Sequence, residues 1–177
     1  MIFSPKKTPK KAAVITVLLY VASAGALLCS RFLAPRLPYQ LIALVCAAIA
    51  IYLTSRYLLT DYKYAIKDAE RASDKIAFSI IKVNGKRENV MANFDLISVY
   101  AFEKCAKVSA FEKKYGKVDK FYNYTSNLGS PLKYMLAMEF NGMKVLFVIE
   151  ADEEFAREIT ARIPEESDKS DSISKQS

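Results

Sequence analysis

The chain has 177 residues and a formal net charge of +7, and all of its excess positive charge lies near its start. Residues 1–59 contain seven Lys or Arg and no Asp or Glu, whereas residues 60–177 contain 19 of each sign. A nucleic-acid binder carries its excess charge on the folded domain, so nucleic acid is not an expected partner. The absence of His removes the commonest general base, the usual nucleophile pairs and most zinc sites. We expect no catalytic residue, metal or cofactor, and we interpret the protein as a non-enzyme.

Two uncharged apolar runs, residues 12–30 and 37–55, follow each other closely. At about 1.5 Å per residue each run forms a helix of roughly 28 Å, close to the roughly 30 Å of bilayer hydrocarbon. We predict transmembrane helices over 12–30 and 37–59, joined by a short outer loop over 31–36. Residues 1–11 are predicted to form a basic cytoplasmic tail.

Basic residues precede the first run and follow the second, and this positive-inside bias places both termini in the cytoplasm of a multi-pass protein of the cell membrane. Tyr39, Arg56 and Tyr57 are the expected anchors at the membrane interfaces. The start also imitates a secretory signal, with Ala22 to Ala24 as a small-residue cleavage site. Cleavage of the first helix therefore remains an open alternative, and it would leave the C-terminal domain in the cytoplasm.

The predicted hairpin is suited to anchorage. Neither run has an ionisable residue near its centre, where ion or proton pathways place them. Small residues at 22–26 and at Ala47, Ala48 and Ala50 permit close packing of the two helices or of neighbouring copies.

Residues 60–165 are expected to form one domain built mainly of short strands, since apolar residues alternate with polar ones. The predicted strands are Tyr62–Ile66, Lys75–Val83, Lys86–Met91, Leu96–Phe102, Phe121–Tyr124, Tyr134–Phe140 and Met143–Glu150. Asn84-Gly85 and Asn141-Gly142 are typical of two-residue hairpin turns. The charged segment 103–120 is predicted to be a short helix or irregular.

A helix is predicted from Asp152 to Ile163. Asp152 is the expected N-cap, and Phe155, Ile159 and Ile163 form an apolar stripe that should pack on the sheets. Residues 166–177 are polar and are expected to be a disordered tail.

Tyr57 to Thr60, running into the strand Asp61 to Ile66 directly behind two membrane helices, resembles the start of the bacterial pleckstrin-homology (PH)-like membrane proteins. The segment Phe94 to Val99 is similar to the stretch at that family's fourth strand. The resemblance implies a membrane-anchored α+β fold, in which a two-helix transmembrane hairpin precedes a mainly-β PH-like sandwich or barrel. That domain would have about seven antiparallel strands and a C-terminal α-helix, and it would act as a binding scaffold.

The resemblance does not carry over a phosphoinositide site, because three acids offset three bases in the loop 67–75. A better candidate surface for anionic lipid headgroups or a partner is a set of lysines between residues 104 and 120, although a solvated face explains them more simply. These lysines are Lys104, Lys107, Lys113, Lys114, Lys117 and Lys120.

Two other clusters have a functional and a simpler reading. Tyr122, Asn123 and Tyr124 are either an aromatic platform for a ligand or an alternating strand with one buried face. The acidic run from Glu150 to Glu154 is either a cation site or, more simply, a set of partners for a helix dipole.

Two functions remain. The first is a membrane-anchored scaffold or binding module whose cytoplasmic PH-like domain binds a protein partner, anionic lipid headgroups of the bilayer or another copy of itself. The alternative is an accessory subunit of a membrane transport or membrane-enzyme complex, in which the hairpin carries the function.

Overall fold

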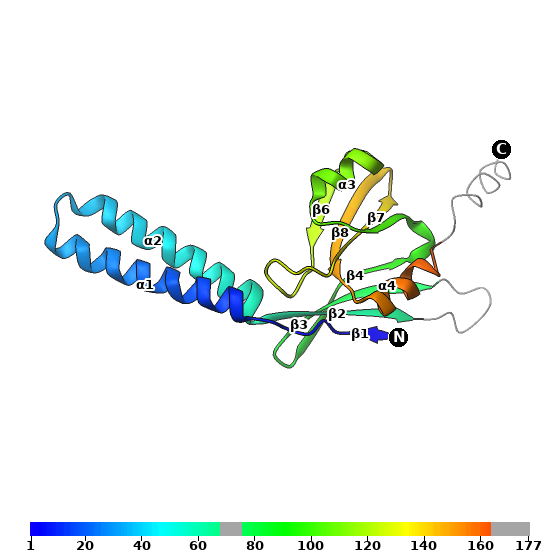
Figure 1. Ribbon diagram of the computed structural model, residues 1–177, viewed down its shortest axis with the longest axis horizontal. Coiled ribbons are helices and arrows are strands. Elements are labelled where there is room, and N and C mark those ends of the chain that lie inside the picture. Colours follow the sequence, from blue (N-terminus) through cyan, green and yellow to red (C-terminus); the bar gives the residue numbers. More distant parts are fainter. Residues whose placement is uncertain (68–75, 164–177) are drawn as a thin grey trace.

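The structure is a computed structural model that describes residues 1–67 and 76–163. A long helical hairpin projects from one end of a domain made of two β-sheets and two short helices (Figure 1). The hairpin consists of α1 (Lys10–Phe32) and α2 (Arg36–Leu53), and a π-helical turn over Thr54–Leu58 continues α2. Both helices are long and apolar enough to cross a membrane. The predicted spans agree with them to within a few residues.

Small residues line the contact between the two helices, as their spacing predicts. Ser23 of α1 is buried and donates a hydrogen bond of 2.9 Å to the carbonyl of Ala43 in α2. Ala50 is fully buried in the same contact, whereas large apolar side chains such as Leu18 and Leu44 point outward and are more than half exposed. This outward apolar surface suits an environment of hydrocarbon rather than water.

The first sheet is antiparallel, with strand order β1-β2-β3-β4. Its strands are β1 (Ile2–Phe3), β2 (Thr60–Lys67), β3 (Ala77–Asn84) and β4 (Arg87–Asp95). Gly85 has a φ of 60°, so the first predicted Asn-Gly hairpin is confirmed. The partner strand β4 extends four residues beyond its predicted end, to Asp95, and Met91 forms a bulge in it because the pairing shifts by one residue there.

The N-terminal segment, predicted as a basic cytoplasmic tail, contributes a strand to the first sheet, because β1 pairs with β2. The amino group of Met1 donates to the carbonyl of Ile66 at 2.6 Å, and the Ile66 amide donates back at 2.8 Å. The ring of Phe3 stacks on that of Phe155, with centroids 4.9 Å apart. Two residues are too few to show a strand period, so no sequence pattern predicted β1.

The second sheet has the strand order β5-β7-β8-β6. Its strands are β5 (Val99–Lys104), β6 (Lys120–Asn123), β7 (Lys133–Phe140) and β8 (Met143–Glu150). Positive φ angles at Asn141 and Gly142 confirm the second predicted hairpin. The predicted all-antiparallel arrangement is wrong at β6, which runs parallel to β8. The chain reverses direction in the loop between β6 and β7, and β8 lies between these two strands, so β6 and β8 run the same way. A 3₁₀ turn over Leu96–Ser98 replaces the start of the predicted fourth strand.

The two remaining helices cover different surfaces of the domain. In α4 (Glu153–Thr160), Phe155 and Ile159 are fully buried between the two sheets, and Asp152 caps the helix by accepting the Phe155 amide at 2.8 Å. This confirms the predicted C-terminal helix. In α3 (Val108–Tyr115), Phe111 packs on the outer face of the second sheet. The part of the predicted 67–75 loop from residue 68 onward, and the predicted tail, lie outside the described residues.

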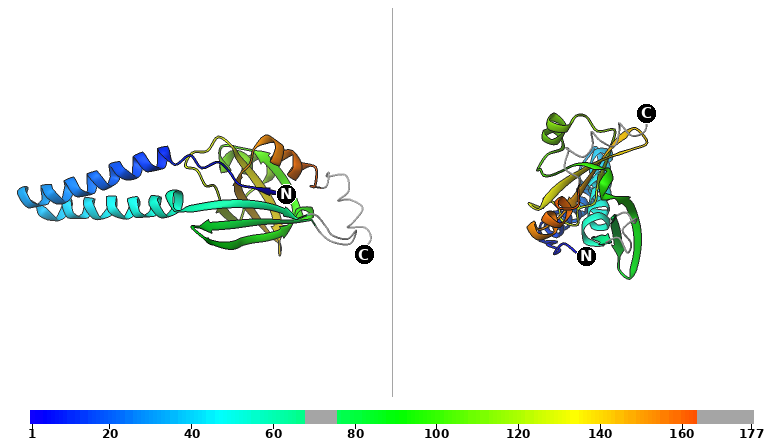
Figure 2. Two further views of the ribbon diagram at one scale, coloured as in Figure 1. Left: turned by 90° about the horizontal axis from the view of Figure 1, so that it is seen from below. Right: turned by 90° about the vertical axis from the view of Figure 1, so that its right-hand side faces the viewer.

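Two four-stranded sheets therefore enclose the core of the described domain, but they do not close into a barrel. The first sheet ends at β4 and the second ends at β6, so the sandwich is open between these two edge strands. Figure 2 shows that the strands of the first sheet extend along the direction of the hairpin.

Candidate functional site: an apolar groove at the open edge of the sandwich

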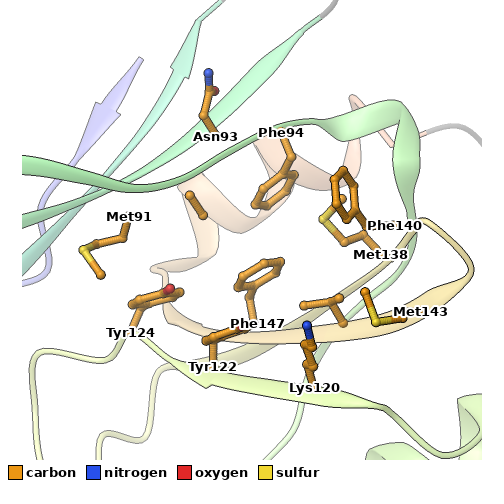
Figure 3. A pocket seen from close by; sticks show the side chains of 12 residues that line it. Met91, Asn93, Phe94, Lys120, Tyr122, Tyr124, Met138, Phe140, Met143 and Phe147 are labelled. Atoms are coloured by element: carbon orange, nitrogen blue, oxygen red, sulfur yellow. The ribbon is translucent and has the colours of Figure 1, made fainter.

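A groove of about 610 Å³ lies where the two sheets separate. The strands β4, β6, β7 and β8 all contribute side chains to it (Figure 3). Most of the lining consists of aromatic rings and methionines, from Met91, Phe94, Tyr122, Tyr124, Met138, Phe140, Met143 and Phe147. An open apolar groove with few polar groups is the usual form of a small-ligand site.

Stacked aromatic rings form the floor of the groove. The Phe147 ring lies 5.1 Å from Phe94 and 5.6 Å from Tyr122, measured between centroids, and these pairs are nearly parallel. Tyr124 stacks on Tyr122 at 6.1 Å. The floor is therefore built in advance of any ligand by rings from both sheets, which costs a ligand little reorganisation.

Tyr122 lies in β6 and Tyr124 directly follows that strand, and burial separates their roles. Tyr124 is 8% exposed and belongs to the core, whereas Tyr122 is 41% exposed and lines the groove. Burial raises the pKa of Tyr124, and the neighbouring hydroxyls of Tyr122 and Tyr62 add to this. The simpler reading of a strand with one buried face is right for Tyr124, and the ligand-platform reading stays a prediction for Tyr122.

Exposed apolar side chains surround the groove. Met91 is 45% exposed and Phe140 is 56% exposed. The bulge in β4 directs Met91 to the groove, as bulges near functional sites often do. An exposed apolar patch on a folded domain is a candidate interaction site. No local signal in the sequence marks this site, because it forms where four strands meet.

Lys120 is the charged residue of the groove lining, and its ammonium group points into the groove (Figure 3). Within residues 1–67 and 76–163, no carboxylate lies within ion-pair distance of it. Lys114 differs, because its ammonium group contacts Glu103 at 2.7 Å. The hydrogen bonds from Lys114 and Tyr115 lower the pKa of the Glu103 carboxyl. Lys120 therefore offers an uncommitted positive charge to an apolar groove.

The six predicted lysines are all exposed, but the fold does not gather them into one site. Lys120 lines the groove and Lys104 borders a depression beside α4. Lys113 and Lys114 lie in the last turn of α3, Lys107 precedes that helix and Lys117 follows it. In Figure 1, α3, which carries Lys113 and Lys114, lies farther from the end of α2 than the loop between β6 and β7 does. Contact of these lysines with lipid or a partner stays a prediction.

The three predicted interface anchors lie at both ends of α2. Tyr39 is in its first turn, near the loop that joins α1 and α2. Arg56 donates a hydrogen bond of 2.7 Å to the carbonyl of Asn123, and its guanidinium lies 5.2 Å from the ring of Tyr57 and 4.9 Å from that of Tyr62. Arg56 therefore joins the end of the hairpin to β6, a contact that its sequence position does not reveal.

A buried polar network forms a second connection, and sequence reasoning missed it. Glu150 is 1% exposed and accepts hydrogen bonds from the amides of Ser126 and Asn127, both at 3.2 Å, and from the Asn127 side chain at 3.1 Å. The Asn127 side chain in turn accepts the amide of Thr8 at 2.6 Å. A buried carboxylate requires such donors. Among the described residues, no group of three or more His, Cys, Asp or Glu is placed to hold a metal, so the acidic run does not form a cation site there.

Comparison with known proteins is consistent with this architecture. No curated protein and no solved structure matches the chain. Residues 2–167 match the family described as Bacterial PH-like domain (DUF6106), and this match covers nearly the whole chain, including the two helices. The chain therefore belongs to the bacterial PH-like domain family DUF6106.

Proposed function

We propose that the protein is a two-span protein of the cell membrane whose hairpin anchors a PH-like binding module on the cytoplasmic side. The observation that carries this proposal is the pairing of β1 with β2, which brings the segments on either side of the hairpin into one sheet. A chain that leaves a sheet, runs out along α1 and returns along α2 has both of its ends on one side of the bilayer.

The charge distribution supports the cytoplasmic side. Lys6, Lys7, Lys10 and Lys11 precede or begin α1, and the positive-inside bias directs such clusters to the cytoplasm. Cleavage after Ala24 would remove β1 and every contact of the N-terminal segment with the domain. Retention of the first helix as a membrane span is therefore part of the proposal.

Contacts beside both helices, at the end of the hairpin nearest the domain, support a fixed orientation of the module. Lys7 forms an ion pair of 2.8 Å with Asp61 and donates to the carbonyl of Leu58 at 2.9 Å. Arg56 joins the other helix to β6. Because both helices are attached, the groove keeps one orientation relative to the membrane, which suits a module that binds at the membrane surface.

Cysteine accessibility in intact cells tests the topology. In a background with Cys29, Cys46 and Cys105 replaced by Ser, we expect Leu33→Cys to react with an impermeant maleimide from outside. Asn141→Cys should react only after permeabilisation. The opposite labelling pattern would refute the proposed orientation, and an intact mass lacking residues 1–24 would refute retention of α1.

Co-purification in mild detergent tests the binding role and separates it from the accessory-subunit alternative. A binding module should lose the lipid or protein that co-purifies with it when the groove is altered by Met91→Glu with Phe140→Glu. Partners that remain bound to this double variant and are lost on substitution of the hairpin surface would favour the accessory subunit.

A further inference from the structure

We propose that the groove between β4 and β6 binds a long-chain fatty carboxylate that it receives from the bilayer. The inference rests on the proposed function only for the position of the domain beside the membrane. Its ligand class follows from the groove itself.

The size and lining of the groove suit a single acyl chain. Its volume of about 610 Å³ lies within the roughly 300 to 1,000 Å³ typical of small-ligand sites. Phe147 and Tyr122 provide a flat apolar floor, and Met91, Met138 and Met143 lie along its length. Methionine side chains adapt to flexible apolar ligands because they are unbranched and polarisable.

Lys120 determines the charge of the expected head group. Its ammonium group points into the groove, and the described residues provide no carboxylate for it. A carboxylate on the ligand would supply the missing partner through charge-assisted hydrogen bonds, which are about twice as strong as neutral ones. An uncharged alcohol of the same length would lack this contact.

The groove begins close to the membrane end of the domain. Its Tyr124 ring lies 5.5 Å from the ring of Tyr62, and the Arg56 guanidinium at the end of the hairpin lies on that Tyr62 ring. Figure 3 shows Met91 and Tyr124 together at one end of the groove, and Phe140 and Met143 at the other. A lipid that leaves the bilayer at the end of α2 would therefore enter the groove at the end formed by Met91 and Tyr124.

The strand edges favour a lipid over a protein occupant. A peptide that adds a strand requires a regular edge, but β4 is interrupted at Met91 and β6 covers only Lys120–Asn123. A second copy is also disfavoured. Two β4 strands paired antiparallel about a two-fold axis would point their hairpins in opposite directions, because the strands of the first sheet follow the hairpin axis (Figure 2).

Photolabelling of the full-length protein tests the proposal. The protein is placed in nanodiscs of zwitterionic phosphatidylcholine with palmitic acid that carries a diazirine near its methyl end, and labelled peptides are mapped by mass spectrometry. We expect saturable labelling of the groove strands, displaced by unlabelled palmitate and much less by hexadecanol. Lys120→Gln should raise the half-saturating concentration about tenfold. Lys117→Gln, which removes an exposed charge outside the groove lining, should not change it.

A groove-filling variant, Met91→Trp at an exposed position of the lining, should abolish labelling of the groove while its circular dichroism melt stays that of the unaltered protein. Labelling confined to α1 and α2 would overturn the proposal, as would equal competition by hexadecanol or equal effects of the two lysine variants. Protection of β6 amides from hydrogen exchange by a co-purified protein, without groove labelling, would assign the groove to a protein partner and would also overturn it. None of these failures would alter the cysteine-labelling result, so the proposed anchor topology would still be judged separately.

Discussion

Replacement of Glu150 by Gln should loosen the attachment of the N-terminal segment to the domain and destabilise the protein. Glu150 lies at the end of β8 with 1% of its surface exposed, and its two carboxylate oxygens accept three hydrogen bonds. The amide of Gln has nearly the same shape but only one acceptor oxygen. Its nitrogen must therefore face at least one donor of the protein.

The less costly orientation places the Gln nitrogen where one carboxylate oxygen accepts the Asn127 amide. That buried amide then loses its partner, which costs about 1 to 3 kcal/mol. The two remaining bonds, from Ser126 and the Asn127 side chain, lose their charge assistance, which adds about 1 kcal/mol. A free energy of unfolding lower by about 2 to 4 kcal/mol corresponds to a melting temperature lower by ~10 °C or more for a domain of this size.

Near-ultraviolet circular dichroism of the full-length protein in detergent measures this change, because the chain has 11 Tyr and no Trp. Limited trypsin digestion gives a second reading, since Asn127 holds the backbone of Lys6 and Thr8. Cleavage after Lys6 and Lys7 should become faster in the variant. Glu139→Gln, at an exposed position of β7, is the matched control.

Equal melting temperatures and equal trypsin rates for Glu150→Gln and Glu139→Gln would refute the reasoning. They would mean that the buried carboxylate does not hold the N-terminal segment, and that β1 pairing and the contacts of Lys7 attach it.

Three further changes test other parts of the fold. Phe155→Ala should lower the free energy of unfolding by about 3 to 5 kcal/mol, because the ring is fully buried, whereas the exposed Arg157→Ala should change it by less than about 0.5 kcal/mol in the same melts. Asp152→Ala should cost about 1 kcal/mol in denaturant unfolding, since it removes the cap that accepts the Phe155 amide. The contact with Lys114 lowers the pKa of Glu103. The contribution of this contact to the free energy of unfolding is therefore complete above the ordinary carboxyl pKa, and it is lost as the pH falls through the lowered pKa. The difference in melting temperature between the unaltered protein and Glu103→Gln should be small at neutral pH, and it should shrink on acidification and in high salt. A difference that grows below pH ~4 would contradict this assignment.

Local features of the chain were predictable because their causes are local. Two apolar runs of bilayer length predict α1 and α2, and Asn-Gly dipeptides at Asn84 and Asn141 predict both hairpins through the positive φ that their turns need. The capped apolar stripe that begins at Asp152 predicts α4. Each of these signals lies within about twenty residues of sequence, where periodicity and turn chemistry act directly.

The features that matter most for function depend on distant residues. Asn127 meets Thr8 across 119 positions, and Glu150 meets Tyr64 across 86, so no window of sequence contains both members of either pair. The parallel position of β6 also follows from the path of a loop rather than from any strand pattern. The candidate groove was not predictable because its lining comes from four strands that separate between β4 and β6.

By itself, the sequence determined that this protein has a two-helix hairpin of membrane length followed by a strand-rich domain with a capped C-terminal helix, because chain length, apolar period and turn residues specify those elements locally. Only the tertiary structure decided that the N-terminal segment joins the first sheet, that Arg56 and Glu150 attach the hairpin to the domain, and that an apolar groove with the uncommitted charge of Lys120 remains open. Burial and hydrogen-bond donors come from residues brought together by folding, and local patterns carry no record of them.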